Sequence, residues 1–326
     1  MSLLPLFDAP EDLPSQAARL APKLRRLAEN GIFFGTSSWK YEGWLGSIYS
    51  PERYRTRGKF SRKAFEAECL EEYAQVFPVV CGDFAFYQFP TAEYWERLFK
   101  STPERFLFAF KAPEDITVAR WPTHARYGTR AGRENATFLD AEVFKTLFAR
   151  RLESYRDQVA TLIFEFGTFA RSTFPTPADF YARLDVFLEA LPGGFRHAVE
   201  IRNPEYLGAD YFALLARHGV AHVFNAWTRM PELGAQRELP GAFTAEFTVV
   251  RALLARGRTY AQAVSAFEPY QLVQEPNVSA RDAMKGIAEE GRRRKIPVFL
   301  FVNNRLEGHA PTTIEAVADR LEASGA

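Results

Sequence analysis

The chain has 326 residues, of which 47% are hydrophobic and 15% aromatic, enough to bury a large core. Its 41 Lys and Arg residues nearly balance 40 Asp and Glu residues, leaving a formal charge of +1. This balance argues against a protein that coats DNA, because neutralising phosphates usually requires a strongly basic surface. It does not argue against a local pocket for an anion.

The cysteine content and the amino-terminal residues indicate the compartment. Two cysteines, Cys69 and Cys81, cannot build a disulfide framework, which is typical of a reducing environment. The start MSLLPLFDAPEDLP has neither the basic region nor the apolar run of a secretory signal. No window approaches the roughly 20 apolar residues that a bilayer-spanning helix needs. We therefore expect a cytoplasmic protein with no membrane partner.

Short apolar runs alternate with helical patterns along most of the chain. Residues 1–30 are expected to form an extension, proline-rich at first and then helical from Ser15 to Glu29. The apolar runs that follow are 32–35, 79–83, 106–111, 161–166, 195–201, 220–224, 243–251 and 296–303. The helical patterns are 62–77, 92–100, 141–158, 177–191, 209–218, 280–295 and 311–322.

This alternation predicts an α/β fold with a parallel sheet that is buried on both faces. Eight such units are sufficient to close a (β/α)8 TIM barrel, although an open, doubly wound sheet has the same alternation. No repeat or low-complexity linker divides the chain. We therefore predict one barrel domain over residues 31–326, preceded by the extension.

Most of the apolar runs end in a polar or charged residue. An unpaired buried charge costs several kcal/mol, so such groups belong at an opening or in a paired network. In a barrel the carboxyl ends of all eight strands open on one face, where active sites are built. We expect these residues to converge there. They are Asp83, Lys111, Glu165, Glu200, Arg202, Asn225, Arg251 and Asn303.

Glu200 and Lys111 are the candidate catalytic residues. Strand alternation places Glu200 and Arg202 on one face, about 7 Å apart. Glu200 would act as a general acid or base while Arg202 holds an anion, or the two form a structural ion pair. Lys111 has the small Ala109 on its own face, which leaves room beside it. It would hold an anion or form a Schiff base, or else its side chain extends to solvent.

The remaining strand-end residues are candidate binding groups. Arg251 suits a phosphate or carboxylate, unless pairing with Glu165 or Glu200 neutralises it. Asn303 and Asn304 point to opposite faces of an extended strand, and we expect Asn303 to face the interior.

Two aromatic residues and the metal question complete the candidate site. Trp39 and Tyr87 follow the first two strands, where they would contact a ligand or pack a loop. The five histidines show no HExxH or paired-cysteine spacing, so no metal ligand is predicted. A divalent metal stays open, because barrel metal sites draw ligands from separate strands. No motif for an organic cofactor is present.

Five motifs in order resemble the YecE-like family, the group called domain of unknown function 72. They are GTSSWKYEGWLGSIYSPERY (35–54), FYQFP (86–90), TPERFLFAFKAPEDIT (102–117), VEIRNPEYL (199–207) and FVNNRLEGHAP (301–311). The resemblance implies a TIM barrel and assigns no activity. In two places the chain departs from the family pattern. Many members resemble V-E-I-N where this chain has Val80-Cys81-Gly82-Asp83, and Q-L-P-P where it has Glu165-Phe166-Gly167-Thr168.

Three functions remain open from the sequence. The first is an enzyme or binding protein for a small phosphorylated or carboxylated metabolite, held by Lys111, Arg202 and Arg251. The second is a nucleic-acid-processing protein, suggested only by analogy with metal-dependent endonuclease barrels. The third is a non-catalytic ligand sensor or interaction module. The sequence does not specify the oligomeric state.

Overall fold

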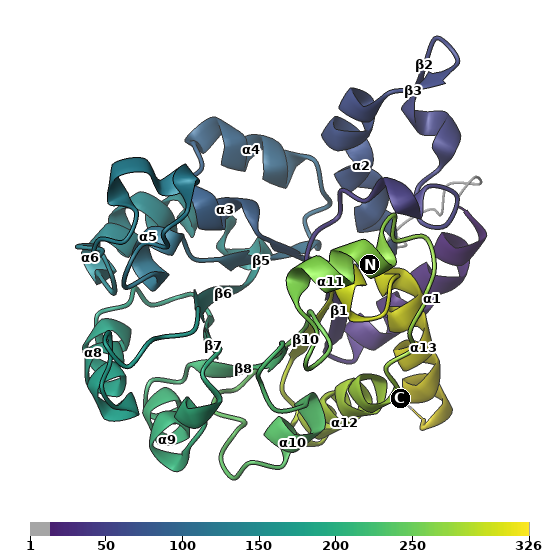
Figure 1. Ribbon diagram of the computed structural model, residues 1–326. Coiled ribbons are helices and arrows are strands. Elements are labelled where there is room, and N and C mark those ends of the chain that lie inside the picture. Colours follow the sequence, from purple (N-terminus) through teal and green to yellow (C-terminus); the bar gives the residue numbers. More distant parts are fainter. Residues whose placement is uncertain (1–13, 326) are drawn as a thin grey trace.

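The computed structural model describes residues 14–325. Eight parallel strands form a closed barrel in the order β1-β10-β9-β8-β7-β6-β5-β4 (Figure 1). The strands are β1 (Ile32–Thr36), β4 (Val79–Gly82), β5 (Leu107–Lys111), β6 (Val159–Phe166), β7 (His197–Ile201), β8 (Ala221–Ala226), β9 (Thr248–Ala252) and β10 (Val298–Val302). Each predicted apolar run overlaps one of these strands, so the predicted barrel is confirmed.

Helices surround the barrel (Figure 1). The longer ones are α1 (Ser15–Glu29), α2 (Arg62–Val76), α4 (Ala92–Lys100), α8 (Pro177–Glu189), α9 (Ala209–Arg217), α12 (Val278–Arg294) and α13 (Ala310–Ala323). The shorter ones are α3 (Phe84–Tyr87), α5 (Glu114–Thr117), α6 (Ala141–Phe144), α7 (Arg150–Leu152), α10 (Leu233–Arg237) and α11 (Tyr260–Phe267). The predicted helix of the extension is confirmed as α1, while residues 1–13 lie outside the described residues. Within residues 14–325 no helix is both long and apolar enough to cross a membrane.

The strand side chains alternate between the barrel interior and the layer beneath the helices. The buried interior cluster is Val79, Cys81, Ala109, Ala160, Ile163, Ala198, Ala221, Val223, Phe247, Val249, Phe299 and Phe301. The larger cluster under the helices contains the alternate residues, such as Val199 and Ile201. The next interior position after Ala109 is Lys111, and the next after Ile163 is Glu165. The apolar filling therefore gives way to charged side chains at the carboxyl end of the barrel.

The structure is helical across the predicted segment 141–158, but it is not one regular α-helix. Helix α6 passes into a π-helical turn (Lys145–Ala149), then α7, then a 3-10 segment (Glu153–Gln158) with a non-helical residue at Tyr155. Phe144, at the end of α6, and Phe148, within the π turn, are both buried. The ring of Tyr155 stacks on Phe99 with centroids 4.1 Å apart. The segment thus packs its aromatic residues inward although its helical geometry changes along its length.

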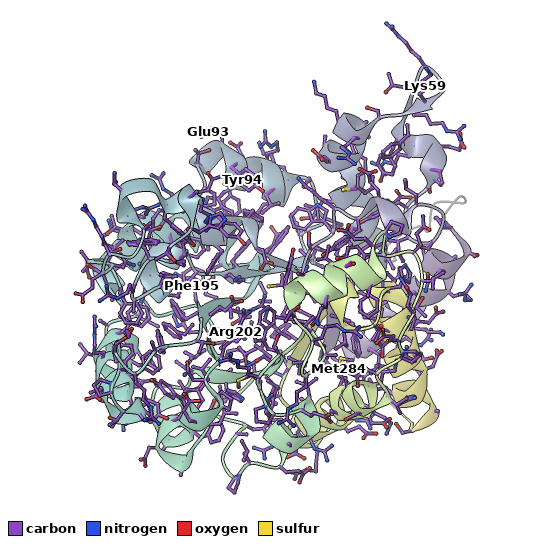
Figure 2. The ribbon with its side chains drawn as sticks, viewed as in Figure 1. Lys59, Glu93, Tyr94, Phe195, Arg202 and Met284 are labelled. Carbon is purple, nitrogen blue, oxygen red and sulfur yellow. The ribbon has the colours of Figure 1, made fainter. Side chains whose placement is uncertain are left out.

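Several short segments were not predicted, among them α3, α5, α10, α11 and a hairpin before α2. Helix α11, between β9 and α12, contributes Ala263 and Phe267 to a small apolar cluster with Leu253, Leu254 and Tyr270. A two-stranded hairpin of β2 (Arg55–Thr56) and β3 (Lys59–Phe60) precedes α2. This hairpin projects from the body of the protein, with Lys59 near its tip (Figure 2).

Candidate functional site

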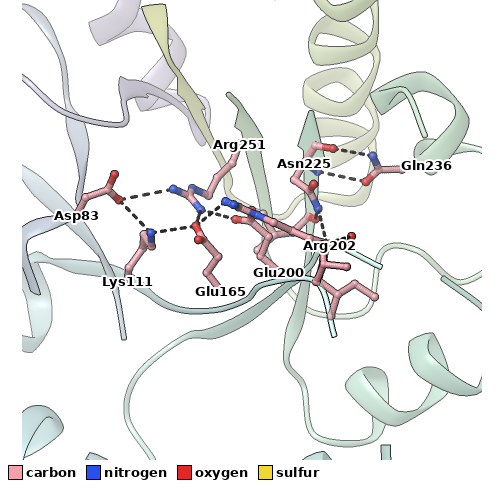
Figure 3. A network of polar contacts seen from close by, with 11 residues as sticks. Asp83, Lys111, Glu165, Glu200, Arg202, Asn225, Gln236 and Arg251 are labelled. Carbon is pink, nitrogen blue, oxygen red and sulfur yellow. Dashed lines mark hydrogen bonds and ion pairs between the residues drawn. The ribbon is translucent and has the colours of Figure 1, made fainter. Parts of the chain in front are cut away.

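Six charged side chains meet at the carboxyl end of the barrel (Figure 3). Asp83 follows β4, Lys111 ends β5, Glu165 lies in β6, Glu200 lies in β7 with Arg202 just after it, and Arg251 lies in β9. We call these six residues the mouth cluster. All six were sequence candidates, and the parallel strands bring them together although 168 residues separate the first from the last in the chain.

Arg251 and Arg202 bind the two glutamates at the base of the cluster. Arg251 Nη1 lies 2.5 Å from Glu165 Oε2 and also contacts Glu200 Oε2. Arg202 Nη2 lies 2.9 Å from Glu165 Oε2 and 3.2 Å from Glu200 Oε1. Glu200 is completely buried and Arg251 is 2% exposed. At the base, each of the two carboxylates therefore contacts both guanidinium groups.

The upper edge of the cluster is held more loosely. Lys111 Nζ lies 3.1 Å from Glu165 but 3.8 Å from Asp83 Oδ1. Arg251 Nη2 lies 3.6 Å from the same Asp83 oxygen. These two distances exceed those of a hydrogen bond, and Asp83 Oδ1 has no hydrogen-bond partner. The Asp83 side chain is 38% exposed, whereas the other five side chains are 13% exposed or less.

The surrounding charges fix the ionisation of the central residues. Burial opposes ionisation of Glu165, but Arg202, Lys111 and Arg251 together hold the pKa of its carboxyl well below the usual value. Burial likewise disfavours the charge on Arg251, but Glu200 and Glu165 raise the pKa of its guanidinium well above the usual value. Three cations and three carboxylates therefore balance to zero within the cluster. Beneath them, burial raises the pKa of the Cys81 thiol to about 12, so this thiol stays protonated and unreactive.

Two aromatic rings support the cations and were not among the sequence candidates. Lys111 Nζ lies 3.8 Å from the centre of the Phe86 ring, and the Arg202 guanidinium lies 3.8 Å from the Trp227 ring. Such contacts stabilise a cation without neutralising it. Trp227 follows Asn225 by two residues and lies just beyond the end of β8. In the sequence, Trp227 could have been identified by its position two residues after Asn225, and Phe86 by its position in the FYQFP motif.

The amide side chains at the mouth connect strands. Asn225 Nδ2 donates to the carbonyl of Ile201, which joins β8 to β7, while its backbone N–H and carbonyl bond to Gln236. Asn303 is buried, and its Oδ1 accepts from the backbone N–H of Arg305. Asn304 accepts from Trp44 Nε1 and from the backbone of residue 310 instead. Asn303 and Asn304 thus have different partners, as expected for side chains on opposite faces.

Trp39 and Tyr87 lie away from the cluster. Trp39 is 6% exposed and packs edge-on against Phe84, on the outer side of the barrel. Tyr87 is 55% exposed, and the guanidinium of Arg126 lies 4.5 Å from its ring. The structure therefore places the ring of Phe86, rather than that of Tyr87, against the charged groups.

No metal-ligand group emerges from the part of the chain that the structure describes. Residues 14–325 contain no set of three or more His, Cys, Asp or Glu side chains arranged to hold a metal ion. The three carboxylates of the mouth cluster converge, but each contacts two or more cationic side chains. Their present partners are therefore guanidinium and ammonium groups.

The fold and the mouth cluster define a (β/α)8-barrel protein with a charge-balanced network at the carboxyl ends of its strands. A family profile, described as protein of unknown function DUF72, matches residues 33–326. The chain belongs to the DUF72 family, in agreement with the resemblance seen in its motifs.

Solved structures of the family show the same fold. A DUF72 family protein from Thermotoga maritima aligns with a TM-score of 0.60 at 20% identity, covering 89% of this chain and 99% of that one. A DUF72 family protein from Enterococcus faecalis aligns in two structures, with TM-scores of 0.60 and 0.56 at 16% and 14% identity. These two alignments cover 89% and 90% of this chain and 95% and 96% of the other. No curated protein matches this chain.

Proposed function

We propose that the mouth cluster binds a small anionic metabolite, bearing a carboxylate or a phosphate, in place of the Asp83 carboxylate. The position of the Asp83 side chain is the observation that supports this proposal. Asp83 is the most exposed member of the cluster, and it faces Lys111 and Arg251 at distances too long for hydrogen bonds. A ligand anion that approaches these two cations by a further ångström would form the hydrogen bonds that Asp83 does not.

The charge count supports an exchange of anions. With Asp83 turned outward, the five remaining charges sum to +1, in a site where an unbalanced charge is costly. A bound monoanion would restore neutrality. Lys111 has three N–H groups and one close carboxylate, and Arg251 Nε has no hydrogen-bond partner. Both cations therefore have donors left for a ligand.

The contacts favour binding and positioning over proton transfer by the glutamates. Glu165 is held as a carboxylate by three cations, so it would orient Lys111 and Arg202 rather than donate a proton. Glu200 is fully buried beneath both arginines, and a role in proton transfer requires that a ligand first separate it from them. Retained binding with lost turnover in Glu200→Gln would assign it that role.

The test is a thermal-shift and calorimetric titration with inorganic phosphate, a sugar phosphate and a dicarboxylate. We expect at least one of these anions to stabilise the wild type. Asp83→Asn, which removes the competing charge at almost constant shape, should lower its Kd at least about fivefold, corresponding to about 1 kcal/mol. Lys111→Met should abolish binding. Lys100→Met is the matched control, because this lysine is exposed and paired with Glu96 on the surface.

The proposal fails if Asp83→Asn leaves anion binding unchanged or weaker, because Asp83 would then not compete with the ligand. It also fails if Lys100→Met weakens binding as much as Lys111→Met. Native mass spectrometry of freshly purified wild type provides an independent measurement, since a retained anion should be present there and depleted in Lys111→Met.

A further inference from the structure

A cavity lies outside the barrel, between α2 and α4. We call it the outer groove; its volume is about 380 Å³, within the range of small-molecule sites. Its lining includes Trp39, Lys40, Lys63, Glu66, Tyr94 and Arg97. Neighbouring barrel helices usually pack against one another, but here a polar groove separates them. Their separation leaves charged side chains facing one space.

The cations of the outer groove have no carboxylate partners. Lys40, Lys63 and Arg97 are exposed, and none forms an ion pair with another residue in the 14–325 range. Glu66 is the acidic residue of the lining, so the groove carries three positive charges against one negative. Like charges that line one groove repel each other, and they raise the local concentration of anions.

Nearby basic residues behave differently. Arg53 lies 2.6 Å from Glu71, and Arg62 lies 2.6 Å from Glu42. The same surface thus pairs its arginines with glutamates just outside the groove. The cations that line the groove therefore differ from these two neighbouring arginines in having no carboxylate partner.

Aromatic rings form part of the wall. Tyr94 and Trp39 both pack against Phe84, with ring centroids 4.9 and 6.2 Å away. Lys40 Nζ lies 5.8 Å from the Trp39 ring, and the Arg97 guanidinium lies 5.6 Å from the Tyr94 ring. Tyr94 is only partly buried, so one face or edge of its ring is available to a planar ligand. The groove therefore combines a stacking surface with phosphate-binding cations.

The basic character continues into the projecting hairpin. Arg57 and Lys59 are exposed there and form no ion pair with any residue that the structure describes. The hairpin leads directly into α2, the helix that carries Lys63 (Figures 1 and 2). If a polynucleotide were bound in the groove, these two cations would be available to its neighbouring phosphates.

We propose that the outer groove binds a nucleotide. Its base would lie against Tyr94 and its phosphate between Lys40, Lys63 and Arg97, because base stacking and charge-assisted phosphate contacts are the interactions that these groups provide. The nucleotide is either free or one unit of a single strand of RNA or DNA. In the second case Arg57 and Lys59 contact the neighbouring phosphates.

Calorimetric titration of the full-length protein tests the groove with adenosine 5′-monophosphate, adenosine and inorganic phosphate. The monophosphate should bind at least about tenfold more tightly than either fragment. The double variant Lys63→Gln/Arg97→Gln should weaken it at least about tenfold, and Tyr94→Leu about 5- to 100-fold. Lys295→Gln is the matched control, because this lysine is exposed and without an ion pair in the described chain. Asp83→Asn should leave nucleotide binding unchanged, which separates this site from the mouth cluster.

A ten-nucleotide oligoadenylate distinguishes the two sources. If the natural ligand is a single strand, the oligonucleotide binds more tightly than the monophosphate, and Arg57→Gln/Lys59→Gln lowers its salt dependence by about 1.4 in log Kd against log salt. If the natural ligand is a free nucleotide, length and the hairpin variant have no effect. The inference is overturned if the monophosphate binds no better than inorganic phosphate, or if the groove variants match Lys295→Gln.

Discussion

Replacing Arg251 should reveal how strongly the mouth cluster depends on its buried cation. Arg251→Met keeps much of the side-chain volume but removes the charge that contacts both Glu165 and Glu200. The cluster then changes from neutral to a net charge of −1 among residues with almost no exposure. Breaking a buried ion pair by removing one partner costs about 3–5 kcal/mol. At about 2 °C per kcal/mol for a large domain, the melting temperature should fall by roughly 6–10 °C.

The assay is urea unfolding at pH 7 followed by circular dichroism, with Arg320→Met as the control. Arg320 pairs with Asp282 on the surface, where both side chains are at least 36% exposed, so its loss should cost no more than about 1 kcal/mol. The double variant Arg251→Met/Glu165→Gln restores neutrality and should recover part of the loss. A loss in Arg251→Met no larger than in Arg320→Met would refute the reasoning, as would a double variant less stable than the sum of the two single changes.

Three further predictions concern pH and close packing. Because the pKa of Glu165 is lowered in the folded protein, its carboxylate adds stability that is fully present above a pH of about 4.3 and is lost as the pH falls toward the lowered value. The difference in melting temperature between wild type and Glu165→Gln should therefore be smaller at pH 3.5 than at pH 6. Burial lowers the pKa of His222 to about 3, so the unfolded chain takes up a proton below pH 6.5 that the folded protein does not. Relative to His222→Leu, the free energy of unfolding of the wild type should fall by up to about 1.4 kcal/mol per pH unit below 6.5. An equal change in the urea midpoints of the two proteins between pH 7 and pH 5 would contradict this. A methyl group on Gly35 would lie 1.9 Å from the carbonyl oxygen of Val79, so Gly35→Ala should cost at least about 3 kcal/mol by urea unfolding. Gly167→Ala, with open space around it, should be close to neutral.

The barrel was predictable because the strand signal is local and repeated. Runs such as 298–302 consist entirely of apolar residues, which is typical of a parallel strand buried on both faces. Helix α1 was predicted to the residue because its apolar positions repeat at the helical period. The changes of helix type within 141–158 were not predicted, because the packing of this segment depends on Phe99 and Phe164, which are remote in sequence. Local periodicity carries no information about such partners.

The gathering of the charged residues also followed from topology, since parallel strands end on one face. What the sequence left undecided was how these charges would pair. Arg251 binds both glutamates, which is the neutralising alternative, and only coordinates show that Asp83 keeps the longest contacts. The outer groove was not predictable for a related reason. It depends on the separation of two helices, and Trp39 was assigned to the mouth because it lies close to β1 in sequence.

The two departures from the family pattern, at Cys81 and at Glu165, concern positions near the same two cations. In the V-E-I-N pattern the glutamate corresponds to Cys81, an interior position of β4 whose thiol is influenced by Arg251 and Lys111. In this chain the acid is instead Glu165, on β6, which contacts these same two cations and Arg202. An acid lost from one strand thus reappears on another that faces the same arginine across the barrel. Glu200 also contacts Arg251, so Glu165 adds a second carboxylate beside a guanidinium whose buried charge would be costly without a partner. Position 81, two residues before Asp83, then holds a thiol that burial keeps neutral rather than another acid.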